Sequence, residues 1–278
     1  MKTLLDKTEI ARWKKIAQQD FDYHQRQFAK PYRSTSYLGE FIRSLIGPTQ
    51  GEALDIACGA GANIFHLSQM IPGFHWSGVD IAGEVLFPIG SPFFNSKGLE
   101  LDLKAGDFYK LEDYFGGKKF DLVLAIHTFS SLESYDALLD QLLSVTRGWL
   151  FATSMFTDFN VDVNIEVKDY TWPEDCPNPG NYNVYSLSRF RKACEAKGCK
   201  QFVSRDFVID VDLPPPENGG LGTYTRKLED GQRLQFSGPI FLPWKVVGVR
   251  MGDSPATSAR GKLPGLQIVR LEKRHPAR

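Results

Sequence analysis

The chain has 278 residues, of which 42% are hydrophobic and 24% charged, and its formal net charge is zero. This composition is typical of a soluble globular protein, and a neutral chain has no overall field that would attract nucleic acid or an anionic membrane. We therefore expect neither as a partner. Residues 1–30 contain no uninterrupted apolar run, so we expect no signal peptide and no membrane span.

The cysteine pattern points to a reducing compartment. None of the four cysteines forms a CxxC pair, so we expect reduced thiols, a cytoplasmic location and no metal site. The four are Cys58, Cys176, Cys194 and Cys199.

Residues 1–50 are expected to form an N-terminal helical cap segment. Thr8–Phe28 mixes charged and glutamine residues with spaced apolar ones, which indicates one or two surface helices. The next helix is expected to have Ser34 or Thr35 as its N-terminal cap and to end at Gly47.

Gly51–Asp80 is predicted to form a strand, a glycine turn, a helix and a second strand. Ala53–Cys58 is a short apolar run that predicts a buried strand, and it leads directly into Gly59-Ala60-Gly61. Ala62–Met70 predicts a helix, and His75–Asp80 predicts a strand that ends in an acid. This order is typical of a nucleotide-binding unit, in which glycines let the backbone approach a ligand and the acid accepts hydrogen bonds from ribose hydroxyls.

Two residues indicate which nucleotide binds. A dinucleotide site has a third glycine for close helix packing, and Ile64 stands at that position. Asp55 lies inside the first strand, where a buried carboxylate is costly unless it holds the turn or faces a cationic ligand. An NAD-dependent oxidoreductase is one alternative interpretation, and both residues argue against it.

The series Asp55, Ala57, Gly59 and Gly61, followed by Asp80, resembles the S-adenosylmethionine site of class I methyltransferases. That family usually has Asp-x-Gly-x-Gly-x-Gly, so an alanine replaces the first glycine here. We expect this departure to be mild, because we place Ala57 in the strand rather than in the turn.

The resemblance covers about Tyr32–Met155 by motif order. It implies a Rossmann-like α/β fold with a seven-stranded, mostly parallel sheet, helices on both faces and an antiparallel last strand. It also implies S-adenosylmethionine as the cofactor. We assign residues 51–251 to this domain and residues 252–278 to a mobile tail, in which Leu266–Leu271 could form a short strand.

The middle of the chain continues the alternation of strands and helices. Ile81–Phe94 is predicted to be an interrupted helix, Leu99–Ala105 a third strand and Phe120–Ile126 a central parallel strand. Tyr135–Thr146 predicts a helix, and Trp149–Met155 a fifth strand.

The last third of the chain combines the end of the sheet with an extra hairpin. Ser186–Lys197 predicts a helix capped by Ser186, Lys200–Val211 a long strand and Pro243–Met251 another strand. Thr223–Leu228 and Arg233–Phe236 predict an additional β-hairpin, because an Asp-Gly turn stands between them.

The resemblance implies a set of cofactor contacts that are spread over four segments. Arg33 could pair with the carboxylate of the cofactor, or it could be solvated. Asp107 and Phe108 match an acid and an aromatic that face the adenine, although Asp107 could instead cap the next helix. The cofactor-binding candidates are Tyr32, Arg33, Asp55, Ala57, Cys58, Gly59, Gly61, Asn63, Asp80, Ile81, Asp107, Phe108 and His127.

His127 lies just beyond the carboxyl end of a central strand, where open α/β sheets bind their ligands. A neutral imidazole there could take a proton from a hydroxyl acceptor as a catalytic base. The alternative is that His127 only lines the cofactor pocket.

Phe156–Tyr185 is too long for an ordinary connection and is rich in acids, asparagines and aromatics, which predicts a lid or binding loop over about residues 156–185. Such a wall would suit a polyhydroxylated or amine acceptor, whereas the alternative for each residue is a solvated loop. The substrate-binding candidates are Asp158, Asp162, Asp169, Tyr170 and Trp172.

These observations predict an S-adenosylmethionine-dependent methyltransferase that acts on a small-molecule acceptor by in-line displacement, at oxygen rather than nitrogen. We expect a monomer or homodimer. A non-catalytic nucleotide-binding member of the fold is the other alternative, because an intact cofactor pocket does not establish catalysis.

Overall fold

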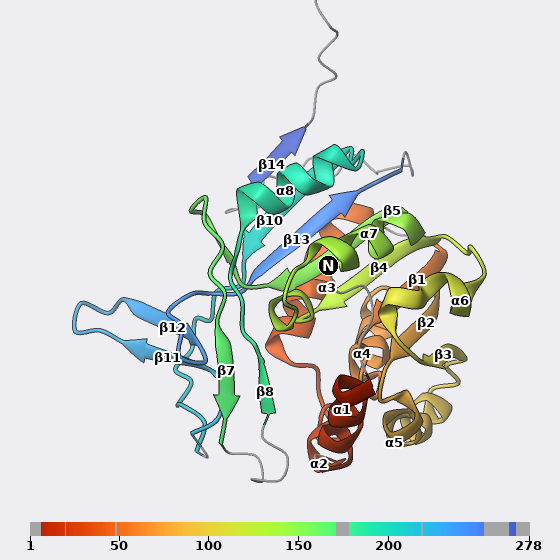
Figure 1. The fold of residues 1–278 in the computed structure, drawn as a ribbon, viewed down its shortest axis with the longest axis horizontal. Coiled ribbons are helices and arrows are strands. Elements are labelled where there is room, and N and C mark those ends of the chain that lie inside the picture. The colour runs from red at the N-terminus through yellow and green to blue at the C-terminus, as the bar shows by residue number, and fades with distance from the viewer. Residues whose placement is uncertain are drawn as a thin grey trace, which may run out of the picture.

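The computed structural model of the chain describes residues 7–19, 21–47, 49–170, 178–217, 219–252 and 267–270. Among these residues, none of the helices has the length and apolar character needed to span a bilayer. An eight-stranded sheet runs through the molecule in the order β14-β10-β13-β5-β4-β1-β2-β3, with helices packed on both of its faces (Figure 1).

Five strands form the parallel part of the sheet: β1 (Gly51–Ile56), β2 (Phe74–Asp80), β3 (Leu101–Ala105), β4 (Phe120–Ile126) and β5 (Thr146–Ser154). The side chains of the central strand β4 are largely buried on both faces, which explains its near-continuous apolar run. The strand order reverses between β1 and β4, and in open α/β sheets ligands bind beyond the carboxyl ends of the strands at such a point.

Three antiparallel strands complete the sheet. β13 (Lys245–Arg250) pairs with both β5 and β10 (Gln201–Asp206), and β14 (Gln267–Arg270) pairs with the outer side of β10. The predicted fold class is confirmed, with β14 as an addition at the edge. The prediction of a strand over Lys200–Val211 is wrong in length: β10 ends at Asp206 because its partner β13 begins opposite that residue, at Lys245.

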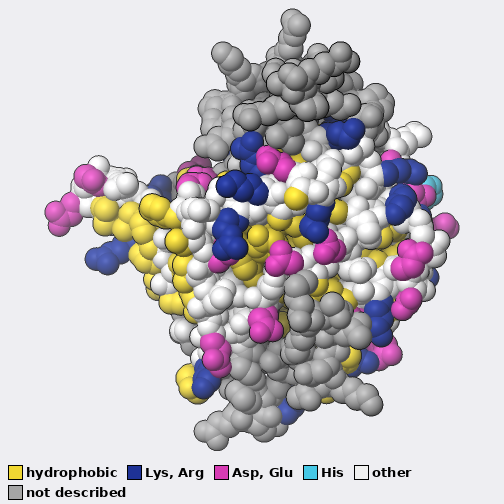
Figure 2. Space-filling view, turned by 45° about the horizontal axis from the view of Figure 1, so that its top comes forward, with side chains coloured by type: hydrophobic (Ala, Val, Ile, Leu, Met, Phe, Trp, Pro, Cys, Tyr) yellow, Lys and Arg dark blue, Asp and Glu magenta, His cyan; other side chains and the backbone are white. Residues whose placement is uncertain are grey.

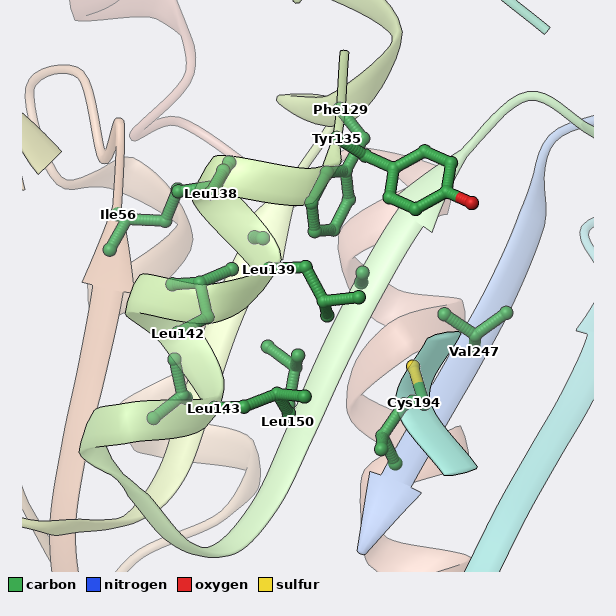
Figure 3. Close-up of a cluster of buried hydrophobic side chains, with 14 of the residues drawn as sticks. Ile56, Phe129, Tyr135, Leu138, Leu139, Leu142, Leu143, Leu150, Cys194 and Val247 are labelled. Atoms are coloured by element: carbon green, nitrogen blue, oxygen red, sulfur yellow. The ribbon is translucent and has the colours of Figure 1, made fainter. Parts of the chain in front are cut away.

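Helices α6 (Leu111–Phe115), α7 (Asp136–Val145) and α8 (Leu187–Ala196) contribute to the larger core. Leu138, Leu139 and Leu142 point from α7 toward Ile56 of β1, Leu150 of β5 and Val247 of β13, as Figure 3 shows. Because strand residues alternate between faces, Leu54 and Ile56 belong to this core.

Helices α3 (Arg33–Ile46) and α4 (Ala62–Met70) pack on the opposite face of β1. Ala53 lies in this second core with Leu38 and Ile64, so the same alternation directs Asp55 toward the α3 and α4 side.

The N-terminal helices pack beside the parallel part of the sheet. α1 (Lys7–Gln19) and α2 (Phe21–Arg26) contact α5 (Gly83–Ser96). The Phe28 ring stacks on Phe93 with a centroid distance of 4.3 Å, and it contacts Phe65 and Phe94 edge-on. This aromatic cluster fixes α2 next to the glycine turn that joins β1 to α4.

The segment that the sequence predicts as a lid loop contains paired strands. β6 (Phe156–Thr157) pairs with β9 (Tyr185–Ser186), and β7 (Glu166–Asp169) pairs with β8 (Asn178–Asn181). We call the ribbon from Val163 to Val184 the arm. Its base is fixed by reciprocal backbone hydrogen bonds between Val163 and Val184, of 2.8 and 2.9 Å. The described part of the predicted lid or binding loop therefore contains short paired strands.

The predicted C-terminal hairpin is confirmed as β11 (Thr223–Lys227) and β12 (Arg233–Ser237). It and the arm extend from the side of the sheet toward which β4 and β5 point (Figure 1). Figure 2 shows apolar side chains along the ribbon that projects at the left, where the Tyr224 and Phe236 rings stack with centroids 4.7 Å apart. On the rest of that face, basic and acidic side chains are interspersed.

Candidate active site

The turn after β1 is built from left-handed backbone conformations. Ala57 has φ of 50°, Gly59 has φ of 58° and Gly61 has φ of 86°. The prediction that Ala57 lies in the strand is therefore wrong: β1 ends at Ile56, and Ala57 begins the turn. A non-glycine residue with positive φ is uncommon. Alanine at this position thus keeps a backbone shape that glycine adopts without strain.

Gly59 and Gly61 serve different purposes. At Gly61 a Cβ atom would lie 2.6 Å from Cζ of Phe94, so this glycine is needed for packing against α5. At Gly59 the nearest atom among the described residues would be Nδ1 of His24, at 4.0 Å. The backbone at Gly59 is therefore the part of the turn that a ligand can approach.

Asp55 is a buried carboxylate without a protein partner. It is 1% exposed, and neither of its oxygens has a hydrogen-bond partner among the described residues. Burial raises the pKa of Asp55 well above its usual value, and the negative charge of Asp80 raises it further. Such a group requires a cation or a hydrogen-bond donor from outside the chain to be stable in its ionised form.

Asp80 holds the glycine turn from the end of β2. It is 8% exposed, and its two carboxylate oxygens accept hydrogen bonds from the amides of Gly59 and Ala82, each at 2.8 Å. Burial raises the pKa of Asp80, and these two hydrogen bonds oppose the shift. A carboxylate has about four lone-pair positions, so each oxygen can accept one further hydrogen bond from a ligand hydroxyl.

Tyr32 and Arg33, the two candidates at the start of α3, are exposed. Tyr32 is the N-cap residue and is 48% exposed, and Arg33 begins the helix with its guanidinium 3.9 Å from the Asp210 carboxylate. No side chain caps this helix, so the prediction of a Ser34 or Thr35 cap is wrong. The hydroxyl of Thr35 instead donates to Oδ1 of Asn63 at 2.7 Å, which ties α3 to α4.

Asp107 and Phe108 follow β3 at the same edge of the sheet. Oδ1 of Asp107 accepts from the amide of Tyr109 at 2.9 Å, so Asp107 caps the short 3-10 helix Phe108–Lys110. Phe108 is 6% exposed and packs in the larger core. Ile81 is half-buried against the cluster around α5. The capping interpretation of Asp107 is thus the one that its contact with Tyr109 supports.

His127 stands at the carboxyl end of β4, directly beside β1. Its amide donates to the carbonyl oxygen and the hydroxyl oxygen of Thr153, at 3.1 and 2.9 Å, and these bonds hold its φ at 57°. Burial lowers the pKa of His127 to about 4, so its imidazole is neutral near pH 7. The ring contacts Trp244 edge-on, with centroids 4.3 Å apart.

Two of the acids that the predicted lid offers as substrate-binding candidates have partners within the protein. The Asp158 carboxylate accepts from the buried ammonium of Lys245 at 3.3 Å, and Asp206 pairs with the same ammonium. Asp162 accepts from the amide of Ser186 and from Arg189, at 2.7 and 2.8 Å. These acids thus fix the insertion to the fold.

Of the other three candidates in the predicted lid, only Tyr170 has a described side chain. Tyr170 is 83% exposed. Asp169 ends β7, where only its backbone is described, and Trp172 lies outside the described residues. Among the described residues, no three His, Cys, Asp or Glu side chains are grouped so that they could hold a metal ion.

Comparison with known proteins decides the family. A family model described as a methyltransferase domain matches residues 23–202, which is more than half of the chain. The chain belongs to the class I S-adenosylmethionine-dependent methyltransferase family. Its cofactor is therefore S-adenosylmethionine. A search of curated proteins finds no match to the sequence.

Solved structures show the same fold at low sequence identity. The Burkholderia thailandensis 1,6-didemethyltoxoflavin-N1-methyltransferase, with bound 1,6-didemethyltoxoflavin and S-adenosylhomocysteine, matches with a TM-score of 0.51 and 12% identity, over 88% of this chain and 89% of that chain. The N-terminal domain of EvdMO1, in the presence of SAH and D-fucose, gives 0.52 and 14%, over 80% and 84%. The cyclase SpnF gives 0.53 and 13%, over 78% and 81%.

The site of this methyltransferase fits the cofactor. The orphaned carboxylate of Asp55 suits a ligand that carries positive charge, and the open backbone at Gly59 suits close approach. Ile64 is fully buried in the second core, and it occupies the space where a dinucleotide-binding helix would have a glycine. Asp80 can hold the ribose while it keeps the turn in place.

His24 lies near the glycine turn, a placement that sequence reasoning missed. It lies on α2 over the glycine turn, with Nδ1 near the position of a Gly59 side chain. No local pattern marks it, because its position depends on the packing of α2 against α5. Trp244 was missed for a similar reason: only the pairing of β13 with β5 brings it to His127.

Proposed function

We propose that this methyltransferase transfers the methyl group of S-adenosylmethionine to an oxygen atom of a small-molecule acceptor. The observation that carries the proposal is the neutral imidazole of His127 at the carboxyl end of β4, next to the strand that presents Asp55. A neutral imidazole can accept the proton that a hydroxyl loses, whereas a neutral amine acceptor has no need of such a base before it is methylated.

The residues of the chain would divide the work between them. Asp55 and Asp80 would bind the charged and ribose parts of the cofactor, and Gly59 would let the backbone approach it. When bound, the cofactor supplies a sulfonium-activated methyl group, so that the carbon–sulfur bond breaks as the carbon–oxygen bond forms. His127 would take up the hydroxyl proton. Alignment of the two reactants can contribute about 7–11 kcal/mol to such a reaction, and the rest of the site has to exclude water.

Two measurements test the proposal. Calorimetry should show binding of S-adenosylhomocysteine and no binding of NAD at the same protein concentration. Transfer of radioactive methyl from S-adenosylmethionine should then be measured with pools of hydroxyl compounds and pools of amines. We expect the hydroxyl pools to give product. Transfer to amines alone would contradict the assignment to oxygen.

A second candidate is a member of the fold that binds the cofactor without transferring a methyl group. One solved structure that shares the fold of this chain is named as a cyclase, and this is a reason to test the second candidate. Binding of S-adenosylhomocysteine with no transfer to any pool would favour this candidate. The cytoplasmic location and the monomeric or homodimeric state stay predictions from the sequence.

A further inference from the structure

Three aromatic rings from distant parts of the chain meet beside the proposed reaction point. The ring centroids of His127 and Trp244 are 4.3 Å apart, with an interplanar angle of 79°. The ring centroids of Tyr182 and Trp244 are 6.3 Å apart, with an interplanar angle of 82°. They come from the segment after β4, the end of the arm and the segment before β13. Nothing in the function proposed so far uses Tyr182 or Trp244.

The position of Tyr182 is fixed by its neighbour. Asn183 is 1% exposed, its amide donates to the carbonyl oxygen of Ser130 at 2.8 Å, and its side-chain nitrogen donates to that of Leu132 at 2.7 Å. Both partners belong to the segment that follows His127. The end of the arm is therefore held against the carboxyl end of β4 by buried hydrogen bonds, and Tyr182 cannot move independently of it.

The position of Trp244 is fixed by the sheet. It immediately precedes β13, whose first residue, Lys245, pairs with Ser154 at the end of β5. The carbonyl oxygen of Trp244 also accepts from the amide of Phe207 at 2.7 Å. Trp244 thus lies at the same sheet edge as His127. It falls outside residues 23–202, the part that matches the family model.

The rings are uncharged, and the acids nearby are occupied. Burial raises the pKa of Tyr182 to about 12 and lowers that of His127 to about 4, so both are neutral near pH 7. Asp158 and Asp206 share the ammonium of Lys245. Both acids therefore already have a cationic partner in Lys245, and the suggestion from the sequence of an amine acceptor held by such acids loses support.

We propose that Tyr182 and Trp244 form the acceptor-recognising wall of the site, and that the acceptor is an uncharged, planar aromatic or heteroaromatic compound that carries the methylated group. This inference rests on the proposed function, because it places the acceptor next to His127. Aromatic side chains recognise planar rings by offset stacking and edge-to-face contacts.

Binding of matched probes to the full chain tests this wall. Naphthol is planar and uncharged, decahydronaphthol is its saturated counterpart, and naphthylmethylamine is a cation near pH 7. In the presence of S-adenosylhomocysteine, saturation-transfer NMR and calorimetry should show that naphthol binds at least about tenfold more tightly than the other two. Tyr182→Leu should weaken naphthol binding by about tenfold, a change of about 1.4 kcal/mol.

Matched variants separate recognition from folding. Tyr182→Phe and Trp244→Phe keep a ring and should retain naphthol binding within about threefold, whereas Trp244→Leu should lose it. Phe241→Leu changes an aromatic ring that is 58% exposed, and it should leave every affinity unchanged. Each variant should bind S-adenosylhomocysteine as the parent does, which shows that the fold and cofactor half are intact.

The outcomes distinguish this inference from the function on which it rests. If S-adenosylhomocysteine binds but naphthol binds no better than decahydronaphthol, or if Tyr182→Leu leaves naphthol affinity unchanged, the aromatic wall is wrong and the methyltransferase assignment stands. If S-adenosylhomocysteine does not bind the parent chain, the function itself fails. Because Trp244→Leu could fail to fold, Tyr182→Leu is the decisive variant.

Discussion

The cofactor half and the acceptor half of the site are built in opposite ways. The cofactor half comes from one strand–turn–helix–strand unit, and it is polar: Asp55, Gly59 and Asp80 act through a carboxylate or a bare backbone. The acceptor half collects His127, Tyr182 and Trp244 from three segments that are far apart in the chain, and it is aromatic and uncharged. The binding site for the cofactor thus depends on residues that are close in sequence, whereas the binding site for the acceptor depends on tertiary packing.

The largest effect is expected at the open glycine. Gly59→Val should weaken S-adenosylhomocysteine binding by at least about 100-fold, because the side chain would occupy the approach to the turn. Left-handed backbone at a β-branched residue should also lower stability by about 1–2 kcal/mol. Calorimetry and thermal unfolding measure the two effects.

Gly98→Val is the matched control for that variant. Gly98 has φ of 62°, and a Cβ there would meet no atom of the described residues within 4 Å. It should show a similar loss of stability with unchanged cofactor affinity. Equal affinity for both valine variants and the parent would mean that the turn does not approach the ligand.

Removal of the acid at the end of β2 should have the next largest effect. Asp80→Ala leaves the amides of Gly59 and Ala82 without their acceptor and removes the ribose contact. We expect a loss of about 10–100-fold in S-adenosylhomocysteine affinity and of about 1–3 kcal/mol in the free energy of unfolding. Asp80→Asn keeps one acceptor oxygen, so its cofactor affinity and its stability should lie between those of the parent and of Asp80→Ala. Unchanged affinity in the alanine variant would count against the assigned pocket.

Asp55→Asn should separate binding from stability. We expect about tenfold weaker S-adenosylhomocysteine binding, because a charge-assisted contact is lost. The ligand-free protein should instead unfold at a higher temperature, by about 2–4 °C for each kcal/mol of desolvation that is relieved. Lower stability of the ligand-free variant would show that Asp55 has a protein partner.

The pH dependence of this stability difference has a definite sign. Since the pKa of Asp55 is raised above its usual value of 3.8, the folded protein holds the proton more tightly than the unfolded chain does. The parent therefore loses stability relative to Asp55→Asn as the pH rises above about 4, and it continues to lose stability up to the raised pKa. Below about pH 4 the two proteins should have similar stability. Thermal unfolding of both proteins across pH 4–8 measures how their stabilities differ as the pH rises.

The smallest effect on cofactor affinity is expected at His127. A base with a pKa of about 4 is weak, so His127→Gln should lower kcat by only about 10–100-fold with a hydroxyl acceptor, at the lower end of the range for general bases. The affinity for S-adenosylhomocysteine should change little. A normal rate at saturating acceptor would remove His127 as the base and leave it as a wall of the pocket.

Sequence patterns predicted the strand, turn, helix and strand of the cofactor half because the determinants of these elements are local. The apolar run before Gly59, the glycines themselves and the acid that ends β2 are all visible within thirty residues of each other, and strand alternation then sets the direction of Asp55. The misplacement of Ala57 has a simple cause: its sequence is compatible with strand, and only the backbone shows the left-handed turn.

The acceptor half could not be predicted in the same way. The acids of the insertion suggested ligand contacts. In the structure, Asp158 forms an ion pair with Lys245 and Asp162 forms one with Arg189, and both partners lie later in the chain. Trp244 gives no local signal of its role, because its place follows from the insertion of β13 between β5 and β10. Pairing partners of this kind are set by the tertiary fold.

One residue of the glycine turn has a consequence for chemical resistance. Cys58 is 6% exposed, and burial together with the charges of Asp80 and Asp55 raises the pKa of its thiol well above the ordinary value. Peroxides and alkylating reagents attack the thiolate, which is scarce under these conditions. The same carboxylates that would attract a positively charged ligand thereby shield the neighbouring sulfur, and the enzyme should withstand oxidative stress without a loss of its nucleoside pocket.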